Sequence, residues 1–189
     1  MNLVLATRNP HKLREFERLL PGHELDPLPA GFELPPETGA TFEENALAKA
    51  RAAARATGAP AIADDSGIEA AALDGGPGVR SARFAGPGAT DADNLAKLRR
   101  QVPPGSALAY HCVLAHVDGA GGGERVFHGR CTGTMADAPR GERGFGYDPV
   151  FIPDDHPGGR TMAELTDAEK DGISHRGRAA RALVTWLEL

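Results

Sequence analysis

The first hundred residues alternate between short apolar runs and segments with helical periodicity, and this order limits the chain to a few folds. Leu3 to Ala6 is an apolar run that predicts a buried strand, and the spacing of leucine and phenylalanine over residues 11–20 predicts a helix. The same pattern continues with strands over 24–28 and 59–63 and helices over 42–57 and 91–101. Strands that alternate with helices are typical of an α/β fold.

The rest of the chain adds strands to this pattern. We predict strands over 107–117 and 125–135, joined through 118–123, a short strand over 150–152, and turn-rich loops over 67–90 and 141–147. Ser174 is placed to cap a last helix whose apolar face is Ala180, Leu183, Val184 and Leu187. The chain therefore predicts one domain over 1–189, an α/β fold with a mixed central sheet flanked by helices.

Charge and cysteine content exclude several classes of protein. The chain has 21 basic and 26 acidic residues, a net charge of −5, whereas a general nucleic-acid binder usually carries a basic excess. Cys112 and Cys131 are the only cysteines and have no CxxC spacing, which indicates a reducing compartment and no zinc site. No apolar stretch approaches the ~20 residues that span a bilayer, and Met1 leads straight into a strand, so we expect no signal peptide and a cytoplasmic protein.

The first polar segment stands where the first strand feeds a helix. Its residues are Thr7, Arg8, Asn9, Pro10, His11 and Lys12. The free N–H groups and the dipole of a helix N-terminus favour a phosphate, although the spacing is not that of a Walker loop. The alternative is a capped turn with solvated cations.

The second polar segment follows a buried strand. Asp64 and Asp65 repel each other there, and a divalent cation such as Mg²⁺ would resolve the conflict. Neighbours on a strand point to opposite faces, so only one of them should face a ligand. Glu37 and Lys49 suggest a metal ligand and a phosphate cation, and Asn45 shares a helix face with Lys49. The alternatives are an Asx-type turn at the aspartates and a solvated helix face.

Two later segments suggest recognition of a flat anionic ligand. Residues 144–149 alternate glycine with aromatic rings, which can bring a ring face and backbone amides against a purine, or form a structural turn. His175 and Arg176 lie in the first turn of the last helix, with Lys170 just before it. Cations oppose the dipole at that end, so an anion or an electron-rich carbonyl should bind there. The alternative is an exposed basic turn.

Six motifs in order make the chain recognisable. They are Thr-x-Asn-x-x-Lys, Glu-Thr-Gly-x-Thr-Phe-x-x-Asn-Ala, Ala-Asp-Asp-Ser-Gly, Pro-Gly-Val-x-Ser-Ala-Arg, Gly-Phe-Gly-Tyr-Asp-Pro and Ile-Ser-His-Arg-Gly, between residues 7 and 177. This order resembles the Ham1-like inosine triphosphate pyrophosphatases. The resemblance implies an elongated α/β fold of the inosine triphosphatase or anticodon-nuclease type, with a twisted sheet, a deep substrate cleft between two lobes, and a homodimer.

The resemblance also implies a reaction and the residues that carry it. The reaction is Mg²⁺-dependent hydrolysis of ITP, dITP and XTP to the monophosphate and pyrophosphate, which removes these nucleotides from the pool. Asp65 would be the general base, Glu37 and Asp65 the metal ligands, and Lys49 a further phosphate contact. The substrate-binding residues would be Thr7, Arg8, Asn9, Pro10, His11, Lys12, Ser66, Phe145, Gly146, Tyr147, Asp148, Lys170, His175 and Arg176.

One departure and two competing functions remain open at this stage. The family often has glycine where this chain has Arg8, which either points outward or adds a phosphate contact. A nucleotide sensor without turnover would use the same residues, but it would not need Glu37 beside Asp64 and Asp65. A dinucleotide-dependent oxidoreductase is disfavoured because GxGxxG is missing after the first strand.

Overall fold

The computed structural model describes residues 1–119 and 122–189 and divides the chain into two compact units. Unit 1 comprises Met1–Asp65, Cys112–His128 and Arg178–Leu189, and unit 2 comprises Ser66–His111 and Gly129–Gly177. Part of the predicted 118–123 connection, residues 120 and 121, lies outside the described residues.

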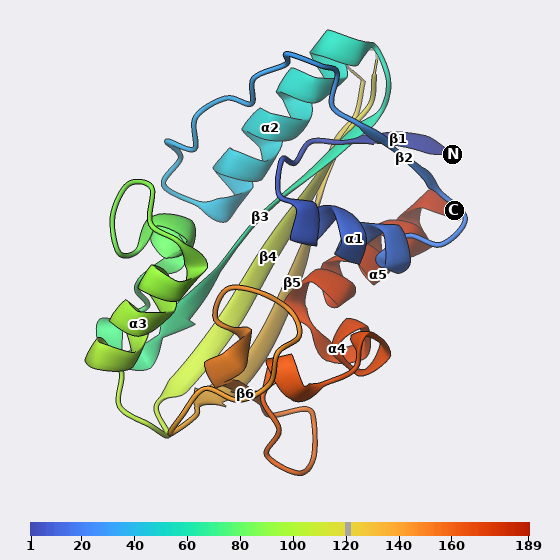
Figure 1. Cartoon of the computed structure of the whole chain (residues 1–189). Helices are drawn as coiled ribbons and strands as arrows, with labels where there is room; N and C mark the ends of the chain where they lie inside the picture. The colour runs from blue at the N-terminus through green and yellow to red at the C-terminus, as the bar shows by residue number, and fades with distance from the viewer. Residues whose placement is uncertain (120–121) are drawn as a thin grey trace. The chain divides into compact units, whose positions relative to one another are not determined.

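The strands form a mixed six-stranded sheet in the order β2-β1-β3-β4-β5-β6 (Figure 1). Their bounds are β1 Asn2–Leu5, β2 Glu24–Pro27, β3 Ala61–Ala70, β4 Ala107–Val117, β5 Glu124–Met135 and β6 Phe151–Pro153. Strand β1 pairs in parallel with both β2 and β3, whereas β5 and β6 are antiparallel. The predicted α/β fold with a mixed sheet is confirmed.

Side-chain caps set where most helices begin. The helices are α1 Pro10–Leu19, α2 Phe42–Thr57, α3 Asp91–Gln101, α4 Asp167–Ile173 and α5 His175–Leu187, with 3₁₀ turns at Ala71–Leu73, Gly78–Arg83, Asp148–Val150 and Met162–Glu164. Helix α2 starts with a Thr41–Glu44 capping box and ends at Gly58, whose φ of 69° suits glycine. Ser174 accepts a hydrogen bond from the Gly177 N–H, which confirms it as the cap of α5.

The core of unit 1 follows the alternation of residues along β3. Ala61 and Ala63 pack with the alanines of α2, whereas Ile62 packs with residues of α1 and α5. Successive strand residues point to opposite faces, so the two helical layers contact alternate residues of the same strand. This alternation continues into Asp64 and Asp65.

The core of unit 2 gathers apolar side chains from β3, α3, β4 and the C-terminal loops. Its large fully buried members include Ile68, Leu98, Phe151, Met162 and Leu165.

No helix in the described ranges 1–119 and 122–189 has the length and apolarity that a membrane crossing needs.

One prediction of local structure was wrong, and one helix was missed. Strand β3 does not end at residue 63 but runs on to Ala70, so Asp64 and Asp65 lie inside a strand and not at its end. The Asp-Asp-Ser-Gly run has turn propensity, but Ile68 and Ala70 are fully buried and sheet pairing prevails over it. Helix α4 was not predicted, although Thr166 and Glu169 form a capping box at its start.

Candidate functional site

In unit 1, two lysines lie among two buried carboxylates and one half-buried carboxylate, and we call this group the carboxylate–lysine cluster. Its members are Lys12, Glu37, Asn45, Lys49, Asp64 and Asp65. The two aspartates are 1% and 5% exposed, and they meet different helices because they alternate along β3. Asp64 pairs with Lys12 of α1, and Asp65 contacts Asn45 and Lys49 of α2.

Lys12 is turned toward Asp64 by the way in which α1 begins. Asn9 caps this helix: its side-chain oxygen accepts from the N–H groups of His11 and Lys12, at 2.9 and 3.3 Å. Thr7 in turn accepts from the Asn9 N–H at 3.1 Å. The Lys12 ammonium then lies 2.9 Å from Asp64. The N–H groups of His11 and Lys12 are therefore bonded to Asn9, as in a capped turn, but Lys12 pairs with a buried carboxylate and is not a solvated cation.

The other residues of this segment lie at its surface. Arg8 is exposed and donates a hydrogen bond to the carbonyl of Phe32. Pro10 occupies the first turn of α1, where its missing N–H costs nothing. His11 contacts the Arg14 guanidinium through Nδ1 at 2.8 Å. Arg8 thus holds the loop around Phe32. Of the two roles considered for Arg8, this contact favours the outward-pointing side chain over the phosphate contact.

Lys49 is the cation on which the carboxylates converge. Its ammonium lies 2.6 Å from Glu37 Oε1 and 3.6 Å from Asp65 Oδ1, and it donates to the Asp64 carbonyl at 2.7 Å. Burial by itself lowers the pKa of Lys49, but the charges of Asp64, Asp65 and Glu37 outweigh it and raise the pKa above its usual value. Lys49 therefore stays protonated and is not on a solvated helix face.

Asp65 is held by Asn45 in an environment that favours proton uptake. Asn45 Nδ2 donates to Asp65 Oδ2 at 2.9 Å, while its oxygen accepts from the Gly39 N–H at 2.8 Å. Burial raises the pKa of Asp65 above its usual value; Lys49 opposes this shift and Glu37 adds to it. A carboxylate with a raised pKa and a fixed orientation suits a general base.

The carboxylate oxygen atoms of Glu37 and Asp65 both lie near one cation, the Lys49 ammonium. No group of three or more histidine, cysteine, aspartate or glutamate residues that could hold a metal occurs in the described part of the chain. Two carboxylates are nevertheless a usual protein contribution to a Mg²⁺ site, because Mg²⁺ keeps several waters and binds substrate phosphates. The residues present therefore fit Mg²⁺ that is shared with a phosphate ligand.

In unit 2, a second group of predicted residues surrounds Asp148, and we call it the Asp148 cluster. Its members are Ser66, Tyr110, Phe145, Asp148, Lys170, His175 and Arg176. Asp148 Oδ2 accepts from Lys170 Nζ at 2.7 Å and from the Phe145 N–H at 3.0 Å. Asp148 Oδ1 accepts from the Tyr110 hydroxyl at 3.1 Å.

The loop before Asp148 is shaped by its glycines and anchored to the rest of unit 2. Gly144 has φ of 71°, and a Cβ there would lie 2.0 Å from Asp148 Oδ2, so only glycine lets the chain close on this carboxylate. The Gly146 N–H donates to Asp91 at 3.0 Å, and the Tyr147 hydroxyl donates to the Ser81 carbonyl at 2.6 Å. Gly146 and Tyr147, predicted to bind substrate, thus anchor the loop.

The three predicted cations of the C-terminal segment are buried, so an exposed basic turn is wrong. Lys170 lies in the last turn of α4, where the helix dipole favours a cation, and not in front of α5 as expected. Arg176 is 2% exposed and donates to Ser66 Oγ at 2.8 Å. The Phe145 ring centroid lies 5.4 Å from Lys170 Nζ and 5.6 Å from Arg176 Cζ.

His175 is oriented by a tyrosine that sequence reasoning missed. The rings of His175 and Tyr110 are stacked, with centroids 4.6 Å apart and an interplanar angle of 9°. Tyr110 lies inside β4 without any motif around it, so no sequence signal marked it. Asn45 had a weak signal, because it is a polar residue four positions before Lys49 on the buried face of an alanine-rich helix.

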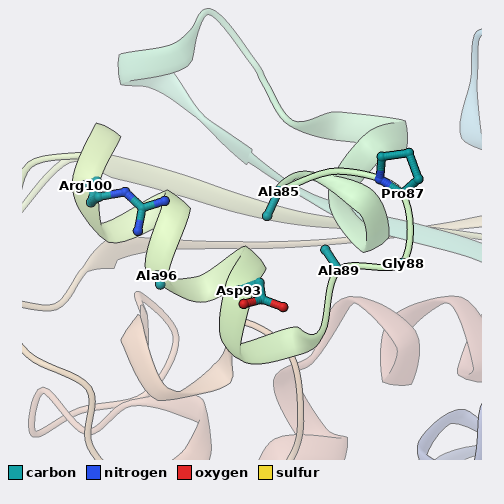
Figure 2. A pocket seen from close by; sticks show the side chains of 7 residues that line it. All are labelled: Ala85, Pro87, Gly88, Ala89, Asp93, Ala96 and Arg100. Atoms are coloured by element: carbon teal, nitrogen blue, oxygen red, sulfur yellow. The ribbon is translucent and has the colours of Figure 1, made fainter.

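One hollow in unit 2 is lined by residues that belong to neither cluster. It has a volume of about 370 Å³ and is lined by Ala85, Pro87, Gly88, Ala89, Asp93, Ala96 and Arg100 (Figure 2). None of the predicted site residues lines this hollow. Its carboxylate, Asp93, accepts from the Thr90 N–H and hydroxyl at the start of α3, which is a structural role.

Comparison with known proteins gives one consistent result. The model of the Ham1 family matches residues 3–186. A dITP/XTP pyrophosphatase of Mycolicibacterium paratuberculosis is 51% identical, covering 98% of this chain and 95% of the relative, and one of Frankia alni is 50% identical, covering 99% and 97%. The solved structure of a HAM1 protein from Coxiella burnetii is 42% identical, with a TM-score of 0.84 over 100% of this chain and 98% of that one. The chain therefore belongs to the Ham1 family.

Proposed function

We propose that this protein hydrolyses the purine nucleoside triphosphates ITP, dITP and XTP to the monophosphate and pyrophosphate. Relatives that are about half identical over nearly the full chain bear the name dITP/XTP pyrophosphatase. The observation that carries the proposal is the orientation of Asp65, a buried carboxylate with a raised pKa that is held by Asn45 beside the Lys49 ammonium. A protein that only bound nucleotides would have no need of such a base.

In the proposed reaction, Asp65 accepts a proton from a water molecule whose oxygen attacks phosphorus. The phosphoanhydride bond between the α- and β-phosphates breaks, and pyrophosphate and the nucleoside monophosphate leave. Phosphoryl transfer depends mainly on position and charge neutralisation, and Lys12 and Lys49 supply positive charge. Asn45 keeps the Asp65 carboxylate aimed, and Glu37 keeps Lys49 in place.

We further propose that Mg²⁺ is the cofactor and that Glu37 and Asp65 hold it. When bound, Mg²⁺ would neutralise the phosphate oxygens and lower the pKa of a coordinated water. The geometry supports this, because both carboxylates lie within 3.6 Å of the Lys49 ammonium and are therefore close enough to share one cation.

The Asp148 cluster is proposed to bind the purine. Asp148 accepts hydrogen bonds only, whereas Lys170 donates only, and Phe145 supplies a ring face beside Lys170 and Arg176. A 6-oxo purine presents an N1–H donor and an O6 acceptor, and adenine presents the reverse. Acceptor and donor groups in this order reject adenine because its polar atoms would be left unpaired.

A panel of nucleoside triphosphates incubated with the protein and Mg²⁺ tests the proposal, with the products separated by ion-exchange chromatography. We expect inosine and xanthosine substrates to give monophosphate and pyrophosphate far faster than ATP.

The predicted homodimer and cytoplasmic location belong to the same proposal. The mass in solution, measured by light scattering, tests the former.

A further inference from the structure

Asp148 is held in place by three donors, and one of them, Tyr110, is a residue that the sequence did not mark as part of a site. Lys170 and the Phe145 N–H occupy Oδ2, and the Tyr110 hydroxyl alone reaches Oδ1 among the bonds described above. Asp148 is 3% exposed. The orientation of its carboxylate is therefore set by protein groups, and Tyr110 decides where its second oxygen lies.

The Tyr110 ring is itself held by contacts with two other aromatic rings. It stacks on His175, as described, and its centroid lies 4.5 Å from that of Phe151 at an angle of 32°. Burial raises the pKa of Tyr110 well above its usual value, and the charge of Asp148 raises it further. The hydroxyl therefore keeps its proton and donates to Asp148.

We infer that Tyr110 is a positioning residue that sets the preference for 6-oxo over 6-amino purines. This inference rests on the proposed function of the Asp148 cluster. Discrimination requires that Asp148 meets the N1 position and Lys170 the C6 position, and not the reverse. A carboxylate that lost its Oδ1 donor would turn and accept the 6-amino group of adenine. Tyr110 prevents this turn, and through its ring it also holds His175.

The test compares Tyr110→Phe with the wild type on ITP and ATP. Phenylalanine keeps the ring contacts with His175 and Phe151 and removes only the hydroxyl. We expect kcat/KM for ITP to fall about 10-fold, as for the loss of one hydrogen bond to a charged group, mostly through KM. We also expect the ITP-to-ATP ratio of kcat/KM to fall at least about 5-fold. A lower folded fraction would reduce both rates equally and leave this ratio unchanged.

The control is Thr161→Val, which removes another buried hydroxyl of unit 2, one that donates to the Arg140 carbonyl at 2.8 Å. Its ratio should stay that of the wild type. Tyr110→Leu, which also removes the stacking, should lower the ratio further. A ratio within about twofold of the wild type in both Tyr110 variants would overturn the inference. A wild-type protein without ITP turnover would instead overturn the proposed function, so the two failures are distinguishable.

Discussion

Asn45 links Asp65 to the loop before α2, because it donates to Asp65 Oδ2 at 2.9 Å and accepts from the Gly39 N–H at 2.8 Å. Asn45→Asp separates the two contacts, since an aspartate still accepts from Gly39 but cannot donate to Asp65. We expect kcat/KM for ITP to fall at least about 10-fold, because a hydrogen bond to a charged group is lost and a second carboxylate then faces Asp65.

Asn94→Asp is the matched control for this variant. Asn94 is also buried and also bridges two groups, donating to the Ala82 carbonyl and accepting from the Ala85 N–H. This variant should lose stability, measured by urea denaturation, with kcat per folded molecule unchanged. If Asn45→Asp retained full activity, Asn45 would have only a structural role.

Asp64 and Asp65 are adjacent and buried, yet we expect their amide variants to differ. Asp65→Asn should lower kcat about 10²- to 10⁴-fold, because an amide cannot act as a general base. Asp64→Asn should have a much smaller effect, since Asp64 pairs with Lys12 and accepts no proton in the proposed reaction. Steady-state kcat values with ITP at saturating Mg²⁺ measure both effects. An Asp65→Asn protein with more than about a tenth of the wild-type kcat would exclude Asp65 as the base.

Lys49→Ala leaves Glu37 and Asp65 without their shared cation. Removing one partner of a buried ion pair typically costs about 3–5 kcal/mol, so we expect a large loss of stability at neutral pH. Because the two carboxylates would then lack a counter-ion, added Mg²⁺ should raise the melting temperature of Lys49→Ala more than that of the wild type. Lys97→Ala, which removes a lysine bonded to the Phe84 carbonyl, serves as the control and should respond to Mg²⁺ as the wild type does. Equal Mg²⁺ responses in all three proteins would argue against a metal site at Glu37 and Asp65.

His116 makes unit 1 sensitive to acid. It is 2% exposed, no hydrogen bond reaches either ring nitrogen within the described residues, and its ring contacts Trp186 edge-on at 5.0 Å. Burial lowers the pKa of His116, although the charge of Asp118 opposes this shift. The unfolded chain therefore takes up the proton first. The free energy of unfolding should be highest above about pH 6.5 and should decrease as the pH falls below it toward the folded-state pKa.

His116→Phe removes this titration and keeps a ring against Trp186. Urea denaturation at about pH 8 and about pH 5.5 should show a weaker loss of stability in the variant, by at most ~1.4 kcal/mol per pH unit between them. An identical loss in both proteins would show that His116 does not titrate on unfolding.

Helices whose ends are set by capping residues close by in the chain could be predicted from the sequence alone. Helix α2 begins at the Thr41–Glu44 capping box and ends at Gly58, and both effects act within a few residues of the chain. The extension of β3 past Asp65 could not be read in this way, because it depends on the burial of Ile68 and Ala70 by distant parts of the chain.

The same distinction applies to the two clusters. Asp65, Asp148 and Lys170 could be identified from the sequence, because carboxylates and cations at unusual positions stand out. Tyr110, which orients Asp148, did not stand out, because it lies 38 residues away in the sequence. Ser66 and Arg176 were each predicted, but the bond between them, across 110 residues, was not. Spacing along a chain carries no information on such contacts, which only the fold creates.

Hydrolysis of ITP in ¹⁸O-labelled water distinguishes the proposed cleavage from every other cleavage of the triphosphate. We expect the protein with Mg²⁺ to produce IMP and pyrophosphate in equal amounts, with one labelled oxygen in one of these two products and no orthophosphate released. Mass spectrometry of the products identifies both the cleaved bond and the phosphorus attacked. Release of orthophosphate with IDP, or binding of ITP without turnover, would contradict the proposed pyrophosphatase reaction.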